Sequence, residues 1–424
     1  MARSTASATK PKITKVQWAL IILLASINFT HILDFVIIMP LGKQLITELQ
    51  ITPGQFGYIV SAYGLAACLA GITAATVVDR FDRRSVLLFN YAGFTISTLA
   101  CGLAPDYTWL LVARAFAGAF GGVTSSAILA VIGDVFPNER RGAAIGAVTS
   151  AFAVASIVGL PAGLMLATHF GRGVPFLALA VLSVPIWIAA FIRLPSLSAH
   201  RDRVSGNIWS ELRTVVTHPN HLRSFAFMFA LVMGTFTIIP FLAPYLELNC
   251  GATREQVAVV YSIAGVFTLI GMNIIGYLTD RYGQRRVFLV MASGSILMTL
   301  AITNMPAWGL AIYAAGATGF MVTAAGRIIP AQAMMIGSSP AALRGRFMNL
   351  NNAVSHMATG IAPLIAGAII TQASDSAPLV GYPIAGLVAV CFASSAIGLA
   401  FLLRSAHKPA VIVEKVDVHE PALA

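Results

Sequence analysis

Long apolar runs separated by short polar stretches make up most of this chain of 424 residues. Twelve of the runs reach about 20 residues, the length at which a helix crosses the hydrocarbon core of a bilayer. Several contain glycine or proline, which membrane helices tolerate when neighbouring helices satisfy the freed backbone groups. The pattern predicts an all-α membrane protein with 12 transmembrane helices. The runs are centred near Ile27, Ala67, Phe94, Gly121, Val154, Val184, Val232, Phe267, Ser295, Phe320, Gly360 and Val390.

A charged phrase that follows the second run returns after the eighth. It reads ATVVDRFDRR from Ala75 and GYLTDRYGQRR from Gly276, which lies 201 residues later. A second landmark, Arg141 followed by glycine, returns as Arg344 followed by glycine, 203 residues later. Repeats of this period in an apolar chain predict two copies of one six-helix membrane unit.

The distribution of basic residues predicts an orientation in the membrane. With both termini inside, 22 of the 27 lysines and arginines fall in the tails and in the loops on that side. This asymmetry satisfies the positive-inside rule and favours a multi-pass protein with cytoplasmic N- and C-termini. Short loops and tails favour a bacterial inner membrane. The net charge of +11 therefore reflects topology, since a nucleic-acid surface would gather its basic residues on one soluble face.

The composition supports a lipid environment and sets the domain boundaries. Hydrophobic residues are 58% of the chain and charged residues only 10%, whereas soluble domains carry about 25% charged residues. We expect a cytoplasmic N-tail over residues 1–16, an N-terminal bundle over 17–193, a basic cytoplasmic linker over 194–223, a C-terminal bundle over 224–403 and a cytoplasmic C-tail over 404–424. Four scattered cysteines and the lack of a zinc-binding spacing predict no metal site.

Ionisable side chains inside the runs are the strongest indication of function, because each costs about 2.5–3.5 kcal/mol to insert. Asp34 is the one acid deep in an apolar run, and helical spacing places Asn28, His31, Asp34 and Phe35 on one face. A carboxyl group held away from water can load and release a proton, so we expect Asp34 to couple transport to protons and His31 to share that proton. The alternative for Asp34 is a structural pairing with Arg114 or with a backbone group, and His31 fits an ordinary packing role equally well.

Arg327 lies in the tenth run and has no charged counterpart in the first repeat. Pro330 follows it and frees a backbone carbonyl, so the helix should bend there. A guanidinium beside broken backbone predicts contact with an anionic or strongly hydrogen-bonding substrate group. A second salt bridge between helices is the alternative. Further candidates for lining a substrate cavity are Asn28, Phe35, Phe236, Thr237, Gln332, Asn349, Asn352 and His356, although packing explains most of them equally well.

Twelve helices in two repeats, the paired DR…RR loops and the basic linker resemble the major facilitator superfamily, over about residues 15 to 405. The first loop departs from the family pattern G-x-x-x-D-R-x-G-x-R-R, because Ala75 and Asp82 replace its glycines. The resemblance implies that the loops act as latches in the outward-facing state, with the arginines reaching carboxylates. The latch candidates are Asp79, Arg80, Arg83, Arg84 and Asp134 in the first repeat, and Gly276, Asp280, Arg281, Gly283, Arg285 and Arg286 in the second.

Two further segments resemble the 12-span drug:proton antiporter group. The fourth run contains LLVARAFAGAFGG, similar to an R-x-x-x-G element, and the resemblance implies a proton-transfer role for Arg114 through contact with the first helix. In the fifth run, Gly159, Pro161 and Gly163 resemble a degenerate form of the antiporter motif G-P-x-x-G. The resemblance implies export.

These observations predict a proton-coupled secondary transporter that exports small amphiphilic drugs or metabolites by alternating access. No G-x-x-x-x-G-K-[ST] motif is present, so we expect no cofactor and a proton gradient as the energy source. Its partners would be the lipid bilayer, a small-molecule substrate and protons, and we expect a monomer. One alternative is a proton symporter that takes up a small organic anion, motivated by Arg327. Alternatives from other classes are a non-transporting membrane sensor and an intramembrane enzyme, and the latter lacks a second intramembrane aspartate for a catalytic dyad.

Overall fold

The computed structural model describes residues 14–77, 81–197, 208–340, 343–374 and 377–404, and within these ranges the chain is almost entirely helical. The helices of the first half are α1 (Lys15–Ile37), α2 (Gly42–Leu49), α3 (Pro53–Val77), α4 (Arg83–Gly102), α5 (Tyr107–Val135), α6 (Asn138–Thr149), α7 (Ala151–Val154), a π-helical turn η2 (Ala155–Gly159), α8 (Leu160–Phe170) and α9 (Val174–Arg193). The second half contains α10 (Ile208–Thr217), α11 (Pro219–Phe236), α12 (Ile239–Leu248), α13 (Arg254–Tyr282), α14 (Gln284–Thr303), α15 (Leu310–Gly326), α16 (Ile328–Gly337), α17 (Arg344–Ile369) and α18 (Tyr382–Leu402).

Eleven helical segments among the described residues are long and apolar enough to cross a membrane. Two of them are interrupted, because α11 runs on into α12 and α15 runs on into α16. The remaining crossing of the first half consists of α6, α7, η2 and α8, a chain of short pieces in place of one long helix. The arrangement confirms the predicted fold of 12 transmembrane helices in two repeats.

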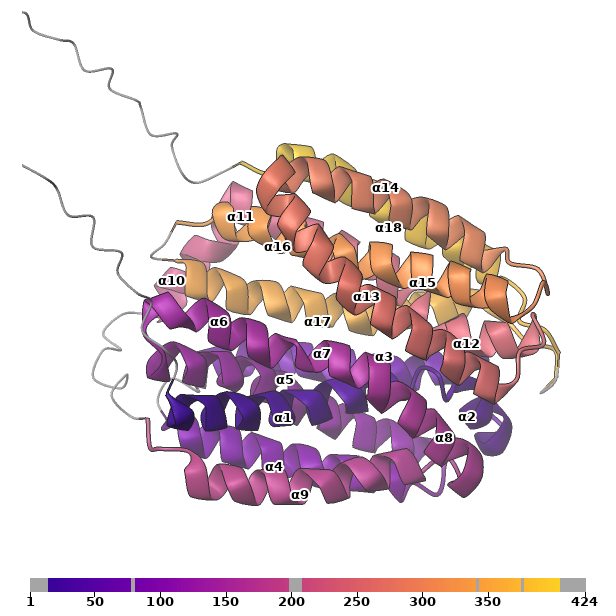
Figure 1. Ribbon diagram of the computed structural model, residues 1–424, viewed down its shortest axis with the longest axis horizontal. Helices are drawn as coiled ribbons and strands as arrows, with labels where there is room; N and C mark the ends of the chain where they lie inside the picture. Colours follow the sequence, from indigo (N-terminus) through magenta and orange to yellow (C-terminus); the bar gives the residue numbers. More distant parts are fainter. Residues whose placement is uncertain (1–13, 78–80, 198–207, 341–342, 375–376, 405–424) are drawn as a thin grey trace, which may run out of the picture.

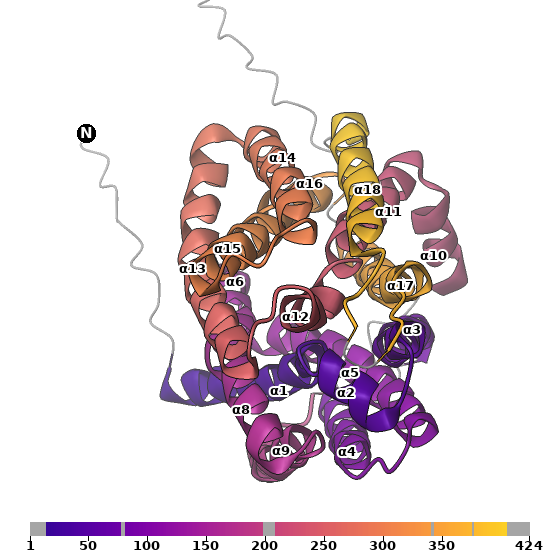
Figure 2. The same ribbon diagram turned by 90° about the vertical axis from the view of Figure 1, so that its right-hand side faces the viewer.

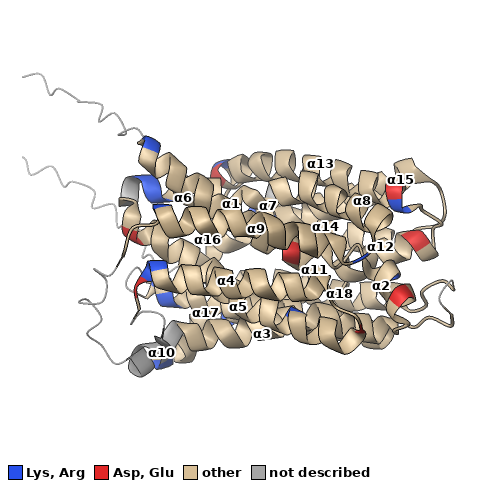
Figure 3. Cartoon of the chain, turned by 90° about the horizontal axis from the view of Figure 1, so that it is seen from below, with Lys and Arg blue, Asp and Glu red and all other residues tan. Residues whose placement is uncertain are grey.

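The helix ends and the lipid-facing sides differ in chemistry. Thr14 caps α1 and Thr253 caps α13, each in a capping box with the glutamine three residues later. The sides of the bundle carry exposed apolar side chains such as Phe89 and Val181, whereas charged residues gather at the two ends (Figure 3). This distribution suits helices that cross hydrocarbon and end in the headgroup region.

The two halves of the chain form two helix bundles that lie side by side (Figure 1). In the second view, the helices from α1 to α9 occupy one side and those from α11 to α18 the other (Figure 2). The bundles meet mainly where α3 packs on α17 and where α13 packs on α8 and η2. We call the end at which α1 begins and α18 ends the inner end, and the end that carries α2 and α12 the outer end (Figure 1).

Glycines bring the bundles into close contact toward the outer end. A Cβ atom added at Gly64 of α3 would lie 2.6 Å from the backbone nitrogen of Gly360 in α17. One added at Gly57 would lie 2.6 Å from the carbonyl oxygen of Pro363. Lys43 of α2 also approaches Glu247 of α12 at 3.5 Å, joining the two bundles. The outer half of the interface is therefore closed by backbone contact and by an ion pair.

The inner half of the same interface is hollow. A cavity of about 310 Å³ lies between α3 and α5 of the first bundle and α17 of the second. Its polar lining comes from Ser126, Asn349, Asn352 and His356, with Arg83 at its edge. The backbone contacts between α3 and α17 thus separate this inner cavity from a second cavity of about 590 Å³ at the outer end, which Gln50, Gly54 and Thr371 line.

Candidate functional site

The centre of the first bundle holds a fully buried ion pair. Nη1 of Arg114 in α5 lies 2.9 Å from Oδ2 of Asp34 in α1, and both side chains are 0% exposed. The same nitrogen donates to the backbone carbonyl of Asp34 at 3.0 Å, and the hydroxyl of Thr98 donates to Oδ1 at 3.2 Å. Each charge is therefore compensated inside the bundle, and removing either one would leave the other buried alone.

Tyr63 of α3 covers this pair. The guanidinium carbon of Arg114 lies 4.6 Å from the centre of the Tyr63 ring, which is a cation–π contact. Gly118, one turn beyond Arg114, allows the approach, because a Cβ atom there would collide with the backbone of Tyr63. The Tyr63 hydroxyl has no hydrogen-bond partner in the part of the chain that the structure describes.

His31 lies beside the pair without bonding to it. Its ring packs at 6.2 Å from Tyr63 and 5.9 Å from Phe94, measured between ring centres. Neither ring nitrogen has a hydrogen-bond partner among the described residues, although the side chain is buried. In the neutral ring one nitrogen is thus free to donate and the other to accept a proton or a hydrogen bond.

Aromatic side chains connect the buried pair to the second bundle. Phe35, next to Asp34 in sequence, lies 5.1 Å from the ring of Tyr63 and 5.6 Å from the ring of Phe236 in α11. We call Tyr63, Phe35 and Phe236 the aromatic bridge. It crosses the interface between the repeats and begins directly above Arg114.

Arg327 is the buried arginine of the second bundle, and its surroundings differ from those of Arg114. It stands between α15 and α16, where the helix is interrupted, and is 1% exposed. Its Nη2 donates to the carbonyl of Leu231 at 3.1 Å and to the hydroxyl of Thr235 at 2.6 Å. No carboxylate among the described residues pairs with it, and its Nε and Nη1 have no hydrogen-bond partner there. The alternative of a second interhelical salt bridge therefore finds no partner in the described chain.

The other candidates for lining a substrate cavity lie in different parts of the structure. Asn349, Asn352 and His356 line the inner cavity together. Asn28 instead donates to the carbonyl of Val148 at 3.1 Å, near the end of α6, so its amide is already used within the first bundle. Gln332 is exposed on α16, and the structure does not bring it to the other candidates.

The first charged loop connects three helix ends. Asp79 and Arg80 lie outside the described residues. Arg83 lies 3.5 Å from Asp134 at the end of α5, as expected for one of the loop arginines, whereas Arg84 donates to the carbonyl of Phe191 in α9 at 2.6 Å. Asp82 occupies the place of the family glycine and accepts a bond from the backbone of Leu197 at 2.6 Å. Its φ of −61° requires no glycine.

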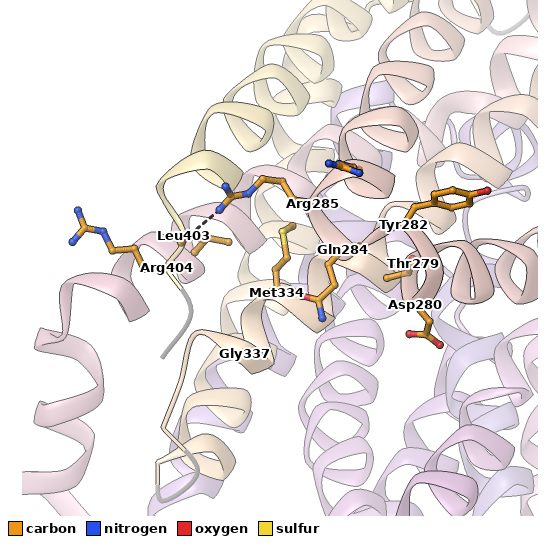
Figure 4. Close-up of a pocket in the computed structure, with 11 residues that line it drawn as sticks. Thr279, Asp280, Tyr282, Gln284, Arg285, Met334, Gly337, Leu403 and Arg404 are labelled. Carbon is orange, nitrogen blue, oxygen red and sulfur yellow. Dashed lines mark hydrogen bonds between the residues drawn. The ribbon is translucent and has the colours of Figure 1, made fainter. Parts of the chain in front are cut away.

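The second loop repeats part of this arrangement. Arg285 donates to the carbonyl of Leu403 beyond α18 at 3.1 Å, as Arg84 does at the end of α9 (Figure 4). Gly283 has a φ of 89°, the left-handed region in which glycine is favoured. Asp280 and Arg286 line a cavity of about 590 Å³ here, and Asp280 makes no bond to any other residue that the structure describes. The Arg281 side chain donates to the Tyr277 hydroxyl at 3.2 Å.

The glycines of the fifth membrane segment face the first helix. A Cβ atom at Gly159 would lie 2.6 Å from Leu33, and one at Gly163 would collide with Ile37. Pro161 stands in the first turn of α8, directly after the π-helical turn. The antiporter-like motif is therefore a packing surface against the helix that carries Asp34. By contrast, Gly276 of the second charged loop has open space around it.

Sequence reasoning missed one buried acid. Glu247 lies at the outer end of α12 with its side chain 4% exposed, 3.5 Å from Lys43 and 4.0 Å from Arg254. The expectation that Asp34 is the one acid deep in an apolar run was thus wrong. Its position inside an apolar run, two residues before Asn249 at the end of α12, was the available signal. Tyr63 and Thr98 were also missed, because single aromatic or hydroxyl side chains are common in membrane helices.

Comparisons with known proteins agree with this architecture. The family model of the Major Facilitator Superfamily matches residues 24–237 and 224–424. The chain is 25% identical to the uncharacterized MFS-type transporter YceJ of Bacillus subtilis, over 84% of this chain and 90% of that protein. It is also 25% identical to Multidrug resistance protein 2 of the same organism, over 68% and 74%.

A solved structure shares the fold. A bacterial homolog of the human lysosomal transporter Spinster, in an inward-facing and unoccupied conformation, superposes with a TM-score of 0.70 at 17% identity, over 92% of this chain and 97% of that one. The family resemblance seen in the sequence is confirmed. The chain belongs to the major facilitator superfamily of membrane transporters, which are not enzymes.

Proposed function

We propose that the protein is a proton-coupled secondary transporter that exports small amphiphilic molecules by alternating access. The observation that carries this proposal is the fully buried Asp34–Arg114 pair beneath the aromatic bridge. An acid held at membrane depth by one partner can exchange that partner for a proton, which an exporter driven by a proton gradient requires.

The contacts of Arg114 suggest how protonation moves the bundles. When Asp34 takes up a proton, its attraction for Arg114 falls, and the guanidinium is left buried without a counter-charge. Arg114 must then shift or recruit another acceptor, and Tyr63 lies on its face at 4.6 Å. Movement of Tyr63 alters the contact of Phe35 with Phe236 in the other bundle. A proton is thereby coupled to the interface that alternating access rearranges.

The orientation in this proposal places the inner end in the cytoplasm. The excess of lysine and arginine at that side supports the assignment. The backbone contacts between α3 and α17 separate the inner cavity from the outer end, which fits a state that receives substrate from the cytoplasm. Relatives named as multidrug resistance proteins support export, and a relative named as an inner membrane transport protein of Escherichia coli supports the bacterial inner membrane.

Purified protein in liposomes with an imposed pH gradient tests the proposal. Wild-type protein should concentrate ethidium or 2-naphthoate against its gradient and release protons, measured with an internal pH dye. Asp34→Asn should abolish both but keep downhill exchange, because the amide retains the shape and cannot titrate. Because the variant also leaves Arg114 buried without its acid, thermal unfolding establishes that it is folded. Asp106→Asn is the matched control, since Asp106 is an exposed helix cap and asparagine caps equally well. Uphill accumulation by Asp34→Asn would contradict the proposal.

Arg327 favours a second candidate, uptake of a small organic anion by proton symport. Its uncompensated charge is the specific observation. A deletion strain separates the two candidates: hypersensitivity to toxic amphiphiles supports export, and loss of growth on an organic acid supports uptake.

A further inference from the structure

Arg327 has three N–H donors that no described residue accepts. A guanidinium carries five donors, two of them on Nη2, and these two are used by the Leu231 carbonyl and the Thr235 hydroxyl. The one donor on Nε and the two on Nη1 remain, in a side chain that is 1% exposed. Arg114 also leaves its Nε and Nη2 without a hydrogen-bond partner among the described residues, but it has the Asp34 carboxylate as its counter-charge. Arg327 has no such acid there, and a buried charge is ordinarily paired, so this arrangement lacks an anion.

The helix is interrupted at Arg327, and one backbone carbonyl there lacks its helical hydrogen bond. α15 ends at Gly326 and α16 begins at Ile328, so Arg327 stands at the junction. Pro330 has no N–H, which leaves the Gly326 carbonyl without its usual helical donor. Interrupted helices of this kind form substrate sites at the repeat interface of transporters.

Arg327 is bonded to the residue of α11 that precedes one member of the aromatic bridge. Thr235, which accepts its bond, is followed in α11 by Phe236, and Phe236 contacts Phe35 of the first bundle. A Cβ atom at Gly234, on the other side of Thr235, would lie 3.4 Å from Nη2, so this turn of α11 is fitted closely to the guanidinium. Arg327 is thus bonded to the turn of α11 that carries Phe236, and Phe236 reaches the first bundle.

We propose that Arg327 binds the carboxylate of the transported molecule, whose apolar part packs against Phe35, Tyr63 and Phe236. The substrate class is then small amphiphilic organic acids. The carboxylate supplies the acceptors that Nε and Nη1 lack, and its binding opens the junction between α15 and α16 around the guanidinium. This inference deepens the proposed export function and rests on it for direction of transport only, because binding at Arg327 needs no gradient.

Matched pairs of acids and amides test the proposal on the purified full-length protein. The probes are benzoate and benzamide, 2-naphthoate and 2-naphthamide, and decanoate and decanamide, with binding measured by calorimetry and by thermal shift. Wild-type protein should bind at least one acid about tenfold or more tightly than its amide, since charge-assisted bonds to a guanidinium favour the carboxylate. Equal binding of each pair, or no binding of any acid, would overturn the proposal.

Two substitutions assign the discrimination to Arg327. Arg327→Gln should bind acid and amide equally. Thr235→Asp places a carboxylate of the protein where the hydroxyl accepts from Nη2, so it should occupy the guanidinium, raise the unfolding temperature and abolish acid binding. The second variant keeps the test decisive if the first does not fold. Arg213→Gln, on the exposed side of α10, is the control and should keep the wild-type discrimination.

The outcomes separate this inference from the proposed function. Proton-coupled export of ethidium that is unchanged in Arg327→Gln, with no preference for acids, would leave the export proposal standing and remove this one. Selective acid binding that needs Arg327, in a protein whose transport ignores the pH gradient, would do the reverse.

Discussion

Two buried arginines distinguish the two repeats of this transporter. Arg114 in the first bundle is matched by Asp34 at 2.9 Å, whereas Arg327 in the second meets only a carbonyl and a hydroxyl. The offset of 203 residues that relates Arg141 to Arg344 takes Asp34 to Thr237 and Arg114 to Ala317, which are both uncharged. Neither buried arginine is therefore a product of the duplication.

The difference suggests a division of work between bundles that share one fold. The Asp34–Arg114 pair is neutral as a whole, and it gains a net positive charge when Asp34 is protonated. The first bundle therefore suits proton coupling. An uncompensated charge attracts an anion from outside the protein, so the second bundle suits substrate binding. The aromatic bridge lies between them and would let each site influence the other.

We expect the largest loss of stability from substitution of Arg114, and this loss tests the comparison of the two arginines. Arg114→Gln leaves the Asp34 carboxylate buried without its partner, and we expect a loss of about 3–5 kcal/mol in unfolding free energy. Arg327→Gln leaves no acid behind and should cost far less. Unfolding in detergent micelles measures both variants side by side.

The double variant Asp34→Asn with Arg114→Gln supplies the control for that prediction. It removes both charges together, so it should recover most of the stability that Arg114→Gln loses. Equal destabilisation by Arg114→Gln and Arg327→Gln would show that the two arginines are held in the same way, and the comparison would fail.

A smaller effect is expected from the glycine that lets Tyr63 reach Arg114. In Gly118→Ala the new methyl group meets the Tyr63 backbone, so α3 must move away from α5, at about 1–3 kcal/mol. The second repeat has Met321 at the corresponding position, so this close crossing belongs to the first bundle alone. Thermal unfolding and the proton release assay measure the outcome.

Gly133→Ala on the same helix is the matched control. No atom lies within 4 Å of a Cβ placed there, so this variant should be neutral or slightly stabilising. If both variants behave alike, the contact of Tyr63 with Arg114 does not depend on Gly118.

The sequence predicted the fold well because apolar length and the repeated charged loops are local signals. The breaks within the fifth segment and at Arg327 were indicated by Pro161 and Pro330. Pairing was harder to predict, since Asp34 and Arg114 are separated by 80 residues and the contact was one of two alternatives. The aromatic bridge gave no signal of its own, because phenylalanine in an apolar run indicates packing as readily as a site.

Glu247 escaped prediction for a different physical reason. Its nearer partner Lys43 belongs to the other bundle, at 3.5 Å, and Arg254 of its own bundle lies at 4.0 Å. Sequence periodicity describes one helix at a time and holds no record of which conformation brings two bundles together. The position of Glu247 in an apolar run could have indicated a buried acid, but its pairing with a residue of the other bundle is seen only in the structure.

The smallest expected effect concerns this third kind of buried charge, an acid whose partner lies in the opposite repeat. Glu247→Gln removes the attraction to Lys43, which is 32% exposed, and should weaken the contact between the bundles at the outer end by about 0.2–1 kcal/mol. Hydrogen exchange in α2 and α12 should then rise, while exchange around Asp34 stays unchanged. Glu48→Gln is the control, because Glu48 pairs at 3.3 Å with Arg172 of its own bundle and its loss leaves the contact between bundles intact. If the two variants raise exchange in α12 equally, the Lys43–Glu247 pair does not hold the outer end shut, and the closure rests on the glycine contacts between α3 and α17 alone.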